Sequence, residues 1–147
     1  MEDKIVQYFI DGIKLVLGEY YIDAIHKFNM LIEESPQSDL ADDAMHNIGL
    51  CYFRMNQFEL AIQTFNQAIS SYPAATISVY DHENAVGMTA AKCYYGIFLC
   101  YLSVGKRDLA VEMKDRLNQF SENTFIKIEN QKITYSELAY NLLITTK

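Results

Sequence analysis

The chain has 147 residues, of which 50% are apolar and 21% are charged, and its formal net charge is −7. This is the composition of one globular domain, and with only two prolines and six glycines we expect helices rather than turn-rich sheet. The negative charge, with a single adjacent basic pair at Lys106-Arg107, argues against a nucleic-acid-binding surface.

The N-terminal residues are acidic rather than basic, and Asp11 and Lys14 interrupt the longest apolar stretch that follows them. This pattern predicts neither a secretory signal nor a membrane span. The three cysteines lie inside apolar stretches, show no CxxC spacing and are interpreted as reduced core residues: Cys51, Cys93 and Cys100. We therefore expect a cytoplasmic protein, or a periplasmic one only if a signal peptide has been removed.

Apolar periodicity predicts six helices in chain order, near residues 3–17, 20–34, 39–55, 58–71, 81–104 and 107–120. Between the members of each pair stand Gly18-Glu19, Asn56-Gln57 and Gly105-Lys106, which tolerate left-handed backbone. The region 123–134 breaks the periodicity, and its segment 124–128 alternates enough to indicate an extended piece or hairpin. A final helix over about 134–146 begins at the capping-box pair Thr134 and Glu137.

A set of small, aromatic and proline residues recurs along the chain. The most complete copy consists of Gly49, Tyr52, Ala61, Phe65, Ala68 and Pro73. The same spacings separate Gly12, Ala24, Phe28 and Pro36, where Leu15 replaces the aromatic residue. A third, degenerate copy retains Tyr101 and Ala110 but has Phe98, Lys114 and Glu122 at three of the landmark positions.

This pattern resembles the tetratricopeptide-repeat family. The resemblance implies an all-α fold, a right-handed α-solenoid of about three helix pairs with a C-terminal capping helix. It divides a single domain, 1–147, into repeats at about 5–38, 42–75 and 81–124 and a cap at about 134–146. The run from Pro36 and Ser38 through Ala41 and Ala44 to Gly49 is also similar to repeats of bacterial envelope-assembly proteins of the outer-membrane and Tol–Pal type.

The resemblance further implies that one face of the first, third and fifth helices lines a concave surface that binds a partner. The residues predicted on that face are Phe9, Ile13, Asp43, His46, Asn47, Leu50, Phe53, Arg54, Lys92, Tyr95 and Leu99. On the first helix the stripe is almost wholly apolar, which suits an extended or helical hydrophobic segment. We weigh equally the alternative that the C-terminal helix or a second copy of the chain covers this stripe.

Relatives that grip the C-terminal carboxylate of a chaperone use five polar or basic side chains on this face. Here Asn47 and Lys92 match that set, whereas Phe9, Ile13 and Gly96 replace the other three. Two donors do not satisfy a buried carboxylate, so a carboxylate clamp is not expected.

The sequence contains no phosphate loop, nucleophile elbow or HExxH motif, and His26, His46 and His82 have no second ligand at helical spacing. We therefore expect no enzyme activity, no cofactor and no metal. The predicted function is a protein-interaction scaffold or adaptor that binds a protein or peptide in an apolar and aromatic groove. The alternatives are a cytosolic secretion-type chaperone that holds an aggregation-prone client and, for the oligomeric state, a homodimer.

Overall fold

The computed structural model describes residues 2–80, 84–120 and 124–146. In this part of the chain the helices are α1 (Glu2–Leu17), α2 (Tyr21–Glu34), α3 (Ala41–Arg54), α4 (Phe58–Ser71), α5 (Thr89–Ser103), α6 (Arg107–Arg116) and α7 (Tyr135–Thr145). A 3-10 turn, η1 (Leu117–Gln119), extends α6. The strands are β1 (Ala85–Val86), β2 (Phe125–Ile128) and β3 (Gln131–Thr134).

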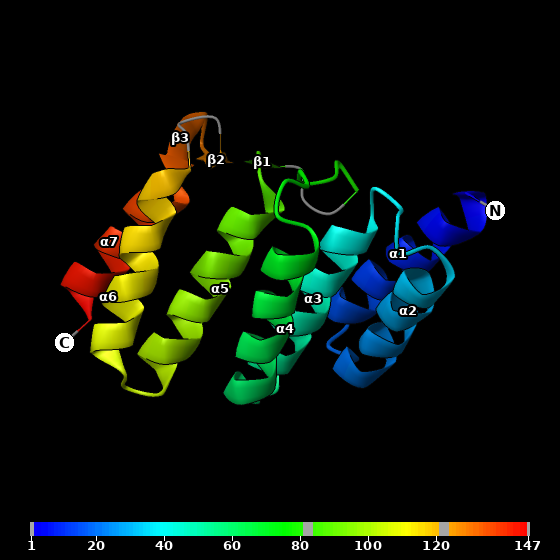
Figure 1. The fold of residues 1–147 in the computed structure, drawn as a ribbon, viewed down its shortest axis with the longest axis horizontal. Coiled ribbons are helices and arrows are strands. Elements are labelled where there is room, and N and C mark those ends of the chain that lie inside the picture. Colours follow the sequence, from blue (N-terminus) through cyan, green and yellow to red (C-terminus); the bar gives the residue numbers. More distant parts are fainter. Residues whose placement is uncertain (1, 81–83, 121–123, 147) are drawn as a thin grey trace.

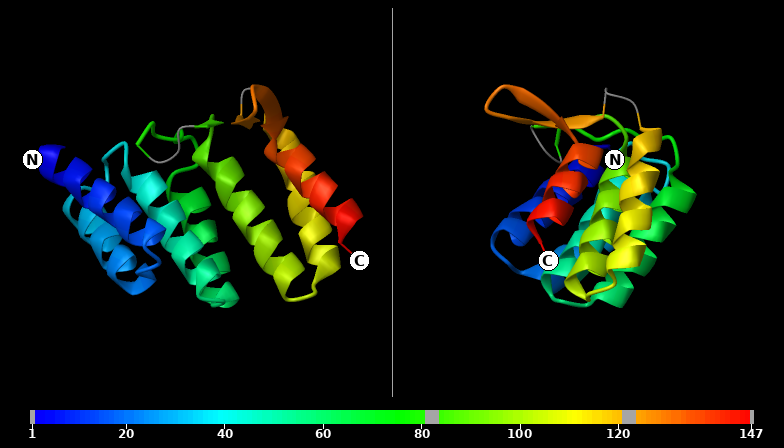
Figure 2. Two further views of the ribbon diagram at one scale, coloured as in Figure 1. Left: turned by 180° about the vertical axis from the view of Figure 1, so that it is seen from behind. Right: turned by 90° about the vertical axis from the view of Figure 1, so that its left-hand side faces the viewer.

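The helices form a helical solenoid in which consecutive helices pack as antiparallel pairs (Figure 1). One layer contains α1, α3 and α5, and the other contains α2, α4 and α6 (Figure 2). Helix α2 packs between α1 and α3, and α4 packs between α3 and α5, because an amphipathic helix must bury its apolar stripe against a neighbour. Helix α6 packs on α5 and contacts α7. The predicted solenoid architecture is confirmed.

The three turns within the helix pairs have one geometry. The residues Glu19, Asn56 and Gly105 adopt positive φ angles of 66°, 61° and 78°. After the first helix of each pair, the next amide donates back to the last turn, from Tyr20 to Leu15 O, Gln57 to Tyr52 O and Lys106 to Tyr101 O. These bonds define a Schellman motif, which satisfies the helix-end carbonyl groups and turns the chain into the partner helix.

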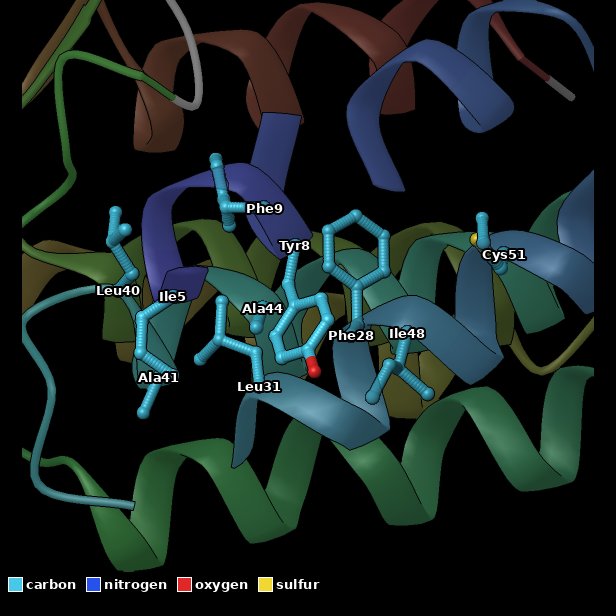
Figure 3. Close-up of a cluster of buried hydrophobic side chains, with 11 residues drawn as sticks. Ile5, Tyr8, Phe9, Phe28, Leu31, Leu40, Ala41, Ala44, Ile48 and Cys51 are labelled. Atoms are coloured by element: carbon cyan, nitrogen blue, oxygen red, sulfur yellow. The ribbon is translucent and has the colours of Figure 1, made fainter. Parts of the chain in front are cut away.

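Aromatic rings from the second layer fill spaces that glycines leave open in the first. A Cβ placed on Gly12 would lie 2.5 Å from the ring of Phe28, and one on Gly49 would lie 2.6 Å from the ring of Phe65. Phe28 also meets Phe9 edge to face, with ring centroids 5.7 Å apart, in the core between α1, α2 and α3 (Figure 3). The glycines therefore permit an approach that any larger residue would block.

The fifth helix is shorter than the sequence predicted. It begins at Thr89, not near residue 81. Residues 81–83 of the predicted extension lie outside the described residues. Strand β1, which follows them, pairs with β2 in the register Ala85 with Ile126 and Val86 with Phe125. Gly87 then adopts a φ of 118° with Thr124 packed against it. Long-range pairing with β2 thus overrides the helical pattern of this segment.

The alternating segment near the C-terminus forms the hairpin that was one of its two predicted conformations. Strands β2 and β3 are antiparallel, with Ile126 opposite Ile133, and residues Glu129 and Asn130 both take positive φ angles in the turn. This is the backbone of a type I′ turn, which suits the right-handed twist of a hairpin. The hairpin stands at the N-terminal end of α7 (Figure 2).

Helix α7 closes the C-terminal end of the solenoid as a cap. Its N-cap is Thr134, whose side chain accepts a hydrogen bond from the Glu137 amide at 3.1 Å, as the capping box predicted. At its other end the Arg107 guanidinium donates to Leu143 O and Thr146 O at 2.7 and 3.0 Å. Both ends of α7 therefore have partners for backbone groups that a helix leaves unsatisfied.

Candidate partner-binding surface

Along α3, the predicted partner-facing stripe is buried at its start and open at its end. Asp43, His46 and Asn47 are buried, Leu50 and Phe53 are half-buried, and Arg54 is exposed. Since the first layer of helices is parallel, the open end of α3 lies at the same side of the molecule as the C-terminal ends of α1 and α5. The accessible part of the stripe is therefore a band on the C-terminal halves of these helices.

The first helix contributes apolar surface to this band. Phe9 is completely buried in the core of Figure 3 and offers nothing to a partner, while Ile13 is half-buried against the same core. Farther along the same stripe, Ile10 is half-buried and Leu17 is 79% exposed. The described contacts of α7 are with α5, α6, η1 and β3, so the cap does not cover the α1 part of the stripe.

The fifth helix is covered where α7 packs on it. The ring of Tyr95 lies 5.6 Å from that of Tyr135 and 5.8 Å from that of Phe98, and Leu99 packs in the same cluster. Burial raises the pKa of the Tyr95 hydroxyl. Helix α7 thus covers part of the stripe on α5, whereas the predicted self-burial concerned the stripe on α1, with which α7 makes no contact of this kind in the described residues.

A buried polar network surrounds the first turn of α3. The Asp43 carboxylate accepts a hydrogen bond from the Ser78 amide at 2.9 Å, and the Asp42 carboxylate accepts one from the Thr89 hydroxyl. The Asn47 amide donates to Asp43 O at 2.8 Å. Buried carboxylates persist only with such partners, and their position at a helix N-terminus adds a favourable dipole interaction. The sequence indicated the dipole, but not the bonds to Ser78 and Thr89.

The positions that match the carboxylate-clamp set are also buried. Asn47 and Lys92 have little accessible surface, and Asp43 lies in the same helical stripe as Asn47. Gly96 faces the core, because a Cβ there would lie 2.6 Å from the ring of Phe65. A long basic side chain at this position would displace Phe65, which gives the physical reason for glycine here.

The buried thiols are core groups. Burial raises the pKa of Cys51 to about 12, with a smaller opposing effect of Arg54, and burial likewise raises the pKa of Cys100 to about 12. Cys93 is also buried. A raised pKa keeps a thiol protonated and therefore poorly nucleophilic, consistent with the interpretation of these residues as small hydrophobes.

Neither a metal cluster nor a membrane-spanning helix occurs within residues 2–80, 84–120 and 124–146. No three His, Cys, Asp or Glu side chains of this part gather closely enough to hold a metal ion. None of its helices combines the length and the apolar character that crossing a bilayer requires.

The chain is similar to known repeat proteins in sequence over one segment and in fold over most of its length. A protein-family profile described as tetratricopeptide repeat matches residues 43–75. The chain carries a tetratricopeptide repeat. The matched segment begins in the first turn of α3, contains all of α4 and ends after Pro73, so it coincides with the pair that holds Gly49 and Phe65. No curated protein sequence matches the chain.

Solved structures show the same tetratricopeptide solenoid fold. The Hsp90 co-chaperone Cns1 from Saccharomyces cerevisiae superimposes with a TM-score of 0.68 at 12% identity, covering 98% of this chain and 39% of that chain. The first tetratricopeptide domain of Spaghetti (RPAP3), bound to the HSP90 peptide SRMEEVD, superimposes with a TM-score of 0.64 at 15% identity, covering 99% of this chain and 97% of that chain. A MamA mutant superimposes with a TM-score of 0.56 at 16% identity, covering 78% of this chain and 53% of that chain.

Proposed function

We propose that this tetratricopeptide solenoid is a protein-interaction module that binds an apolar polypeptide segment across the C-terminal halves of α1 and α3. The observation that supports it is the open band on these helices, where Ile10, Ile13, Leu17 and Leu50 keep accessible apolar surface. Apolar side chains that gather on one face of a repeat protein are a binding surface rather than scattered exposure. The segment would lie across the helices, with its apolar side chains on this band.

The polar part of the predicted stripe supports an apolar rather than an acidic ligand. A domain of the same fold holds an HSP90 peptide that ends in Glu-Glu-Val-Asp. In this chain Asn47 and Lys92 are buried and Gly96 is packed on Phe65. The Asp43 carboxylate in the same stripe would also repel an incoming carboxylate.

The first experiment compares a leucine inside the band with one outside it. Leu50 lies in the band on α3, and Leu60, which is 42% exposed, lies on α4 in the other layer. The probe is a fluorescein-labelled amphipathic peptide of leucine and lysine, followed by fluorescence anisotropy. We expect Leu50→Glu to weaken binding by about tenfold or more, since it places a carboxylate against the apolar side of the peptide.

Leu60→Glu adds the same charge elsewhere and is expected to leave the affinity unchanged. Equal loss in both variants would show that charge, not the band, governs binding and would contradict the proposal. A second probe, the peptide SRMEEVD, is expected to show no saturable binding, and its C-terminal amide form is expected to behave identically. Binding that depended on the free carboxylate would instead assign a carboxylate clamp to this surface.

The biological partner is sought with the same pair of variants. Proteins that co-purify with the wild type and with Leu60→Glu, but not with Leu50→Glu, are partners of the band. If such a partner stays soluble only when it is co-expressed with this chain, the function is that of a chaperone. If it forms a stable multi-protein complex, the function is that of a scaffold.

A further inference from the structure

The connection between α4 and α5 is much longer than the corresponding connection between α2 and α3. It runs from Tyr72 to Met88, whereas the earlier one runs from Ser35 to Leu40. A long connection inside a compact repeat domain is commonly functional. Its first part, up to residue 80, does not simply cross the surface, because hydrogen bonds hold it on both sides.

One side of this segment pairs with the strand that leads into α5. The Thr89 amide donates to Ala75 O at 3.0 Å and the Ile77 amide to Gly87 O at 2.8 Å, with an antiparallel bridge between Thr76 and Met88. The segment is therefore extended and lies antiparallel to the residues that link β1 to α5.

The other side of the segment is held by α3. The Ser78 amide donates to the Asp43 carboxylate, which belongs to the stripe predicted to face a partner. Asp43 has no accessible surface, and Asn47, one turn farther along the stripe, is buried as well. A position that would contact a bound segment is thus occupied by the chain's own backbone.

The same residues also approach the first helix. Ser78 and Tyr80 help to line a depression of about 740 Å³ that is lined on α1 by Lys4, Ile5 and Val6. The next residue along the segment, Val79, is 84% exposed, so nothing within the described chain packs over its side chain. The segment therefore extends from the start of α5 past α3 toward α1, and the hydrogen bond from Ser78 to Asp43 anchors it on α3.

We propose that residues 76–80 form a strap that closes the N-terminal half of the concave surface, with Asp43 as its latch. Release of the Ser78 amide from Asp43 uncovers the buried half of the stripe on α3 and lengthens the accessible surface. This inference rests on the proposed function for its consequence, since a longer surface binds the apolar segment more tightly. The covering of the surface itself is testable without any partner.

The test removes the latch from the strap side. Ser78→Pro deletes the amide hydrogen that Asp43 accepts, and proline is compatible with extended backbone. Val79→Pro places the same ring at the neighbouring, exposed position and keeps the Ser78 amide. Both changes are made in a chain with Asn47→Cys, and the rate of labelling of that thiol by a maleimide dye is measured. The parent chain without Asn47→Cys gives the background from Cys51, Cys93 and Cys100.

We expect Ser78→Pro to raise the labelling rate by about threefold or more over Val79→Pro, as a shift toward the open strap requires. Equal rates in folded protein would overturn the strap. Should Ser78→Pro fail to fold by circular dichroism, Asp43→Asn replaces it, which removes the charge of the acceptor at nearly constant size. Equal labelling of the Asn47→Cys chain with and without Asp43→Asn would then overturn the strap as well.

The leucine and lysine peptide separates this inference from the proposed function. Tighter binding to Ser78→Pro than to Val79→Pro supports both. Faster labelling together with no peptide binding to any variant supports the strap and contradicts the proposed function. Peptide binding that depends on Leu50 but not on Ser78, with unchanged labelling, supports the proposed function and overturns the strap.

Discussion

Phe65 packs between two glycines that belong to different helices. A Cβ on Gly49 of α3 or on Gly96 of α5 would lie 2.6 Å from its ring. The ring therefore links the second helix pair to the third, and its complete burial contributes about 1.5–3 kcal/mol. Gly49 belongs to the repeat pattern, whereas the role of Gly96 follows only from the approach of α4 to α5.

The substitution Gly96→Ala tests this packing against helix propensity. In an open helix, alanine would be more stable than glycine by about 0.5–1 kcal/mol. Here we expect the opposite sign, a loss of about 1–3 kcal/mol in the free energy of unfolding, because the added methyl group meets the Phe65 ring. Urea denaturation gives the value.

Phe65→Leu supplies the control for that measurement. A smaller side chain makes room for the methyl group, so the double variant should lose less stability than the sum of the two single variants. Strict additivity would show that Gly96 and Phe65 are not in the contact described.

The left-handed turn residues differ in the strain that they carry. Gly105 adopts its φ of 78° without a Cβ, whereas Glu19 and Asn56 adopt positive φ with one. For a residue with a Cβ this conformation costs about 1–2 kcal/mol, and asparagine tolerates it better than glutamate. Among the three equivalent turn positions, Glu19 therefore carries the largest backbone strain.

We expect Glu19→Gly to raise the free energy of unfolding by about 0.5–1 kcal/mol, because the relief of strain exceeds the added flexibility of the unfolded chain. The midpoint of urea denaturation should rise at an unchanged slope. The reverse change, Gly105→Ala, is expected to lower stability, since it introduces a Cβ at positive φ with no neighbour within 4 Å. A gain in stability from Gly105→Ala would refute this explanation.

At the scale of elements, α3 is the helix around which the domain is built. Nine consecutive residues, 41–49, are buried, including polar ones. Amphipathic periodicity predicts a solvent-facing side for such a helix, and that prediction holds only for its last turn. The buried carboxylates of Asp42 and Asp43 accept hydrogen bonds from Thr89 and Ser78, which are far along the chain.

The beginning of helix α7 depends on residues close in sequence, and its packing depends on residues far away in sequence. Its beginning follows from Thr134 and Glu137, which are close in sequence. Its packing on α5 and the hydrogen bonds of Arg107 at its C-terminus depend on the fold. The N-terminal signal can therefore be tested alone.

Thr134→Ala is expected to destabilise the domain by about 0.5–2 kcal/mol, because the Glu137 amide loses its acceptor. Thr134→Ser keeps the hydroxyl group and should lie close to the wild type in thermal or urea denaturation. If serine and alanine were equally destabilising, the cap hydrogen bond would not be the cause.

On the scale of the whole molecule, three apolar cores follow one another along the solenoid, each shared by consecutive helices. Titratable groups are buried in these cores. Burial raises the pKa of Cys51 and of Cys100 to about 12, and it also raises the pKa of Tyr95. In the unfolded chain the thiols return to an ordinary pKa near 9.0.

Stability should consequently fall at alkaline pH. Above about pH 9 the unfolded chain releases the thiol protons that the folded chain still holds, so the free energy of unfolding decreases as pH rises toward 12. Urea denaturation at a series of pH values measures the slope. A chain with Cys51→Ala and Cys100→Ala should show a shallower decline, and an identical slope in both proteins would contradict the role of the thiols.

Much of the solenoid could be predicted because its signals are local or periodic. Gly12, Gly49, Phe28 and Phe65 recur at fixed spacings, since each helix pair solves the same packing problem. The turn residues and the capping box act within a few residues of one another. The boundaries of the first and third repeats remain predictions.

The tertiary structure decided which part of the predicted partner-binding stripe is accessible. Phe9, Asp43 and Leu50 all belong to that predicted stripe. Phe9 is enclosed by a neighbouring helix and Asp43 is bound by Ser78, whereas Leu50 keeps accessible surface. The late start of α5 has the same kind of cause, pairing of Ala85 with Ile126. Such contacts join residues that are distant in sequence, and no local period records them. The sequence therefore determined the repeating scaffold, and long-range contacts decided where its surface is open.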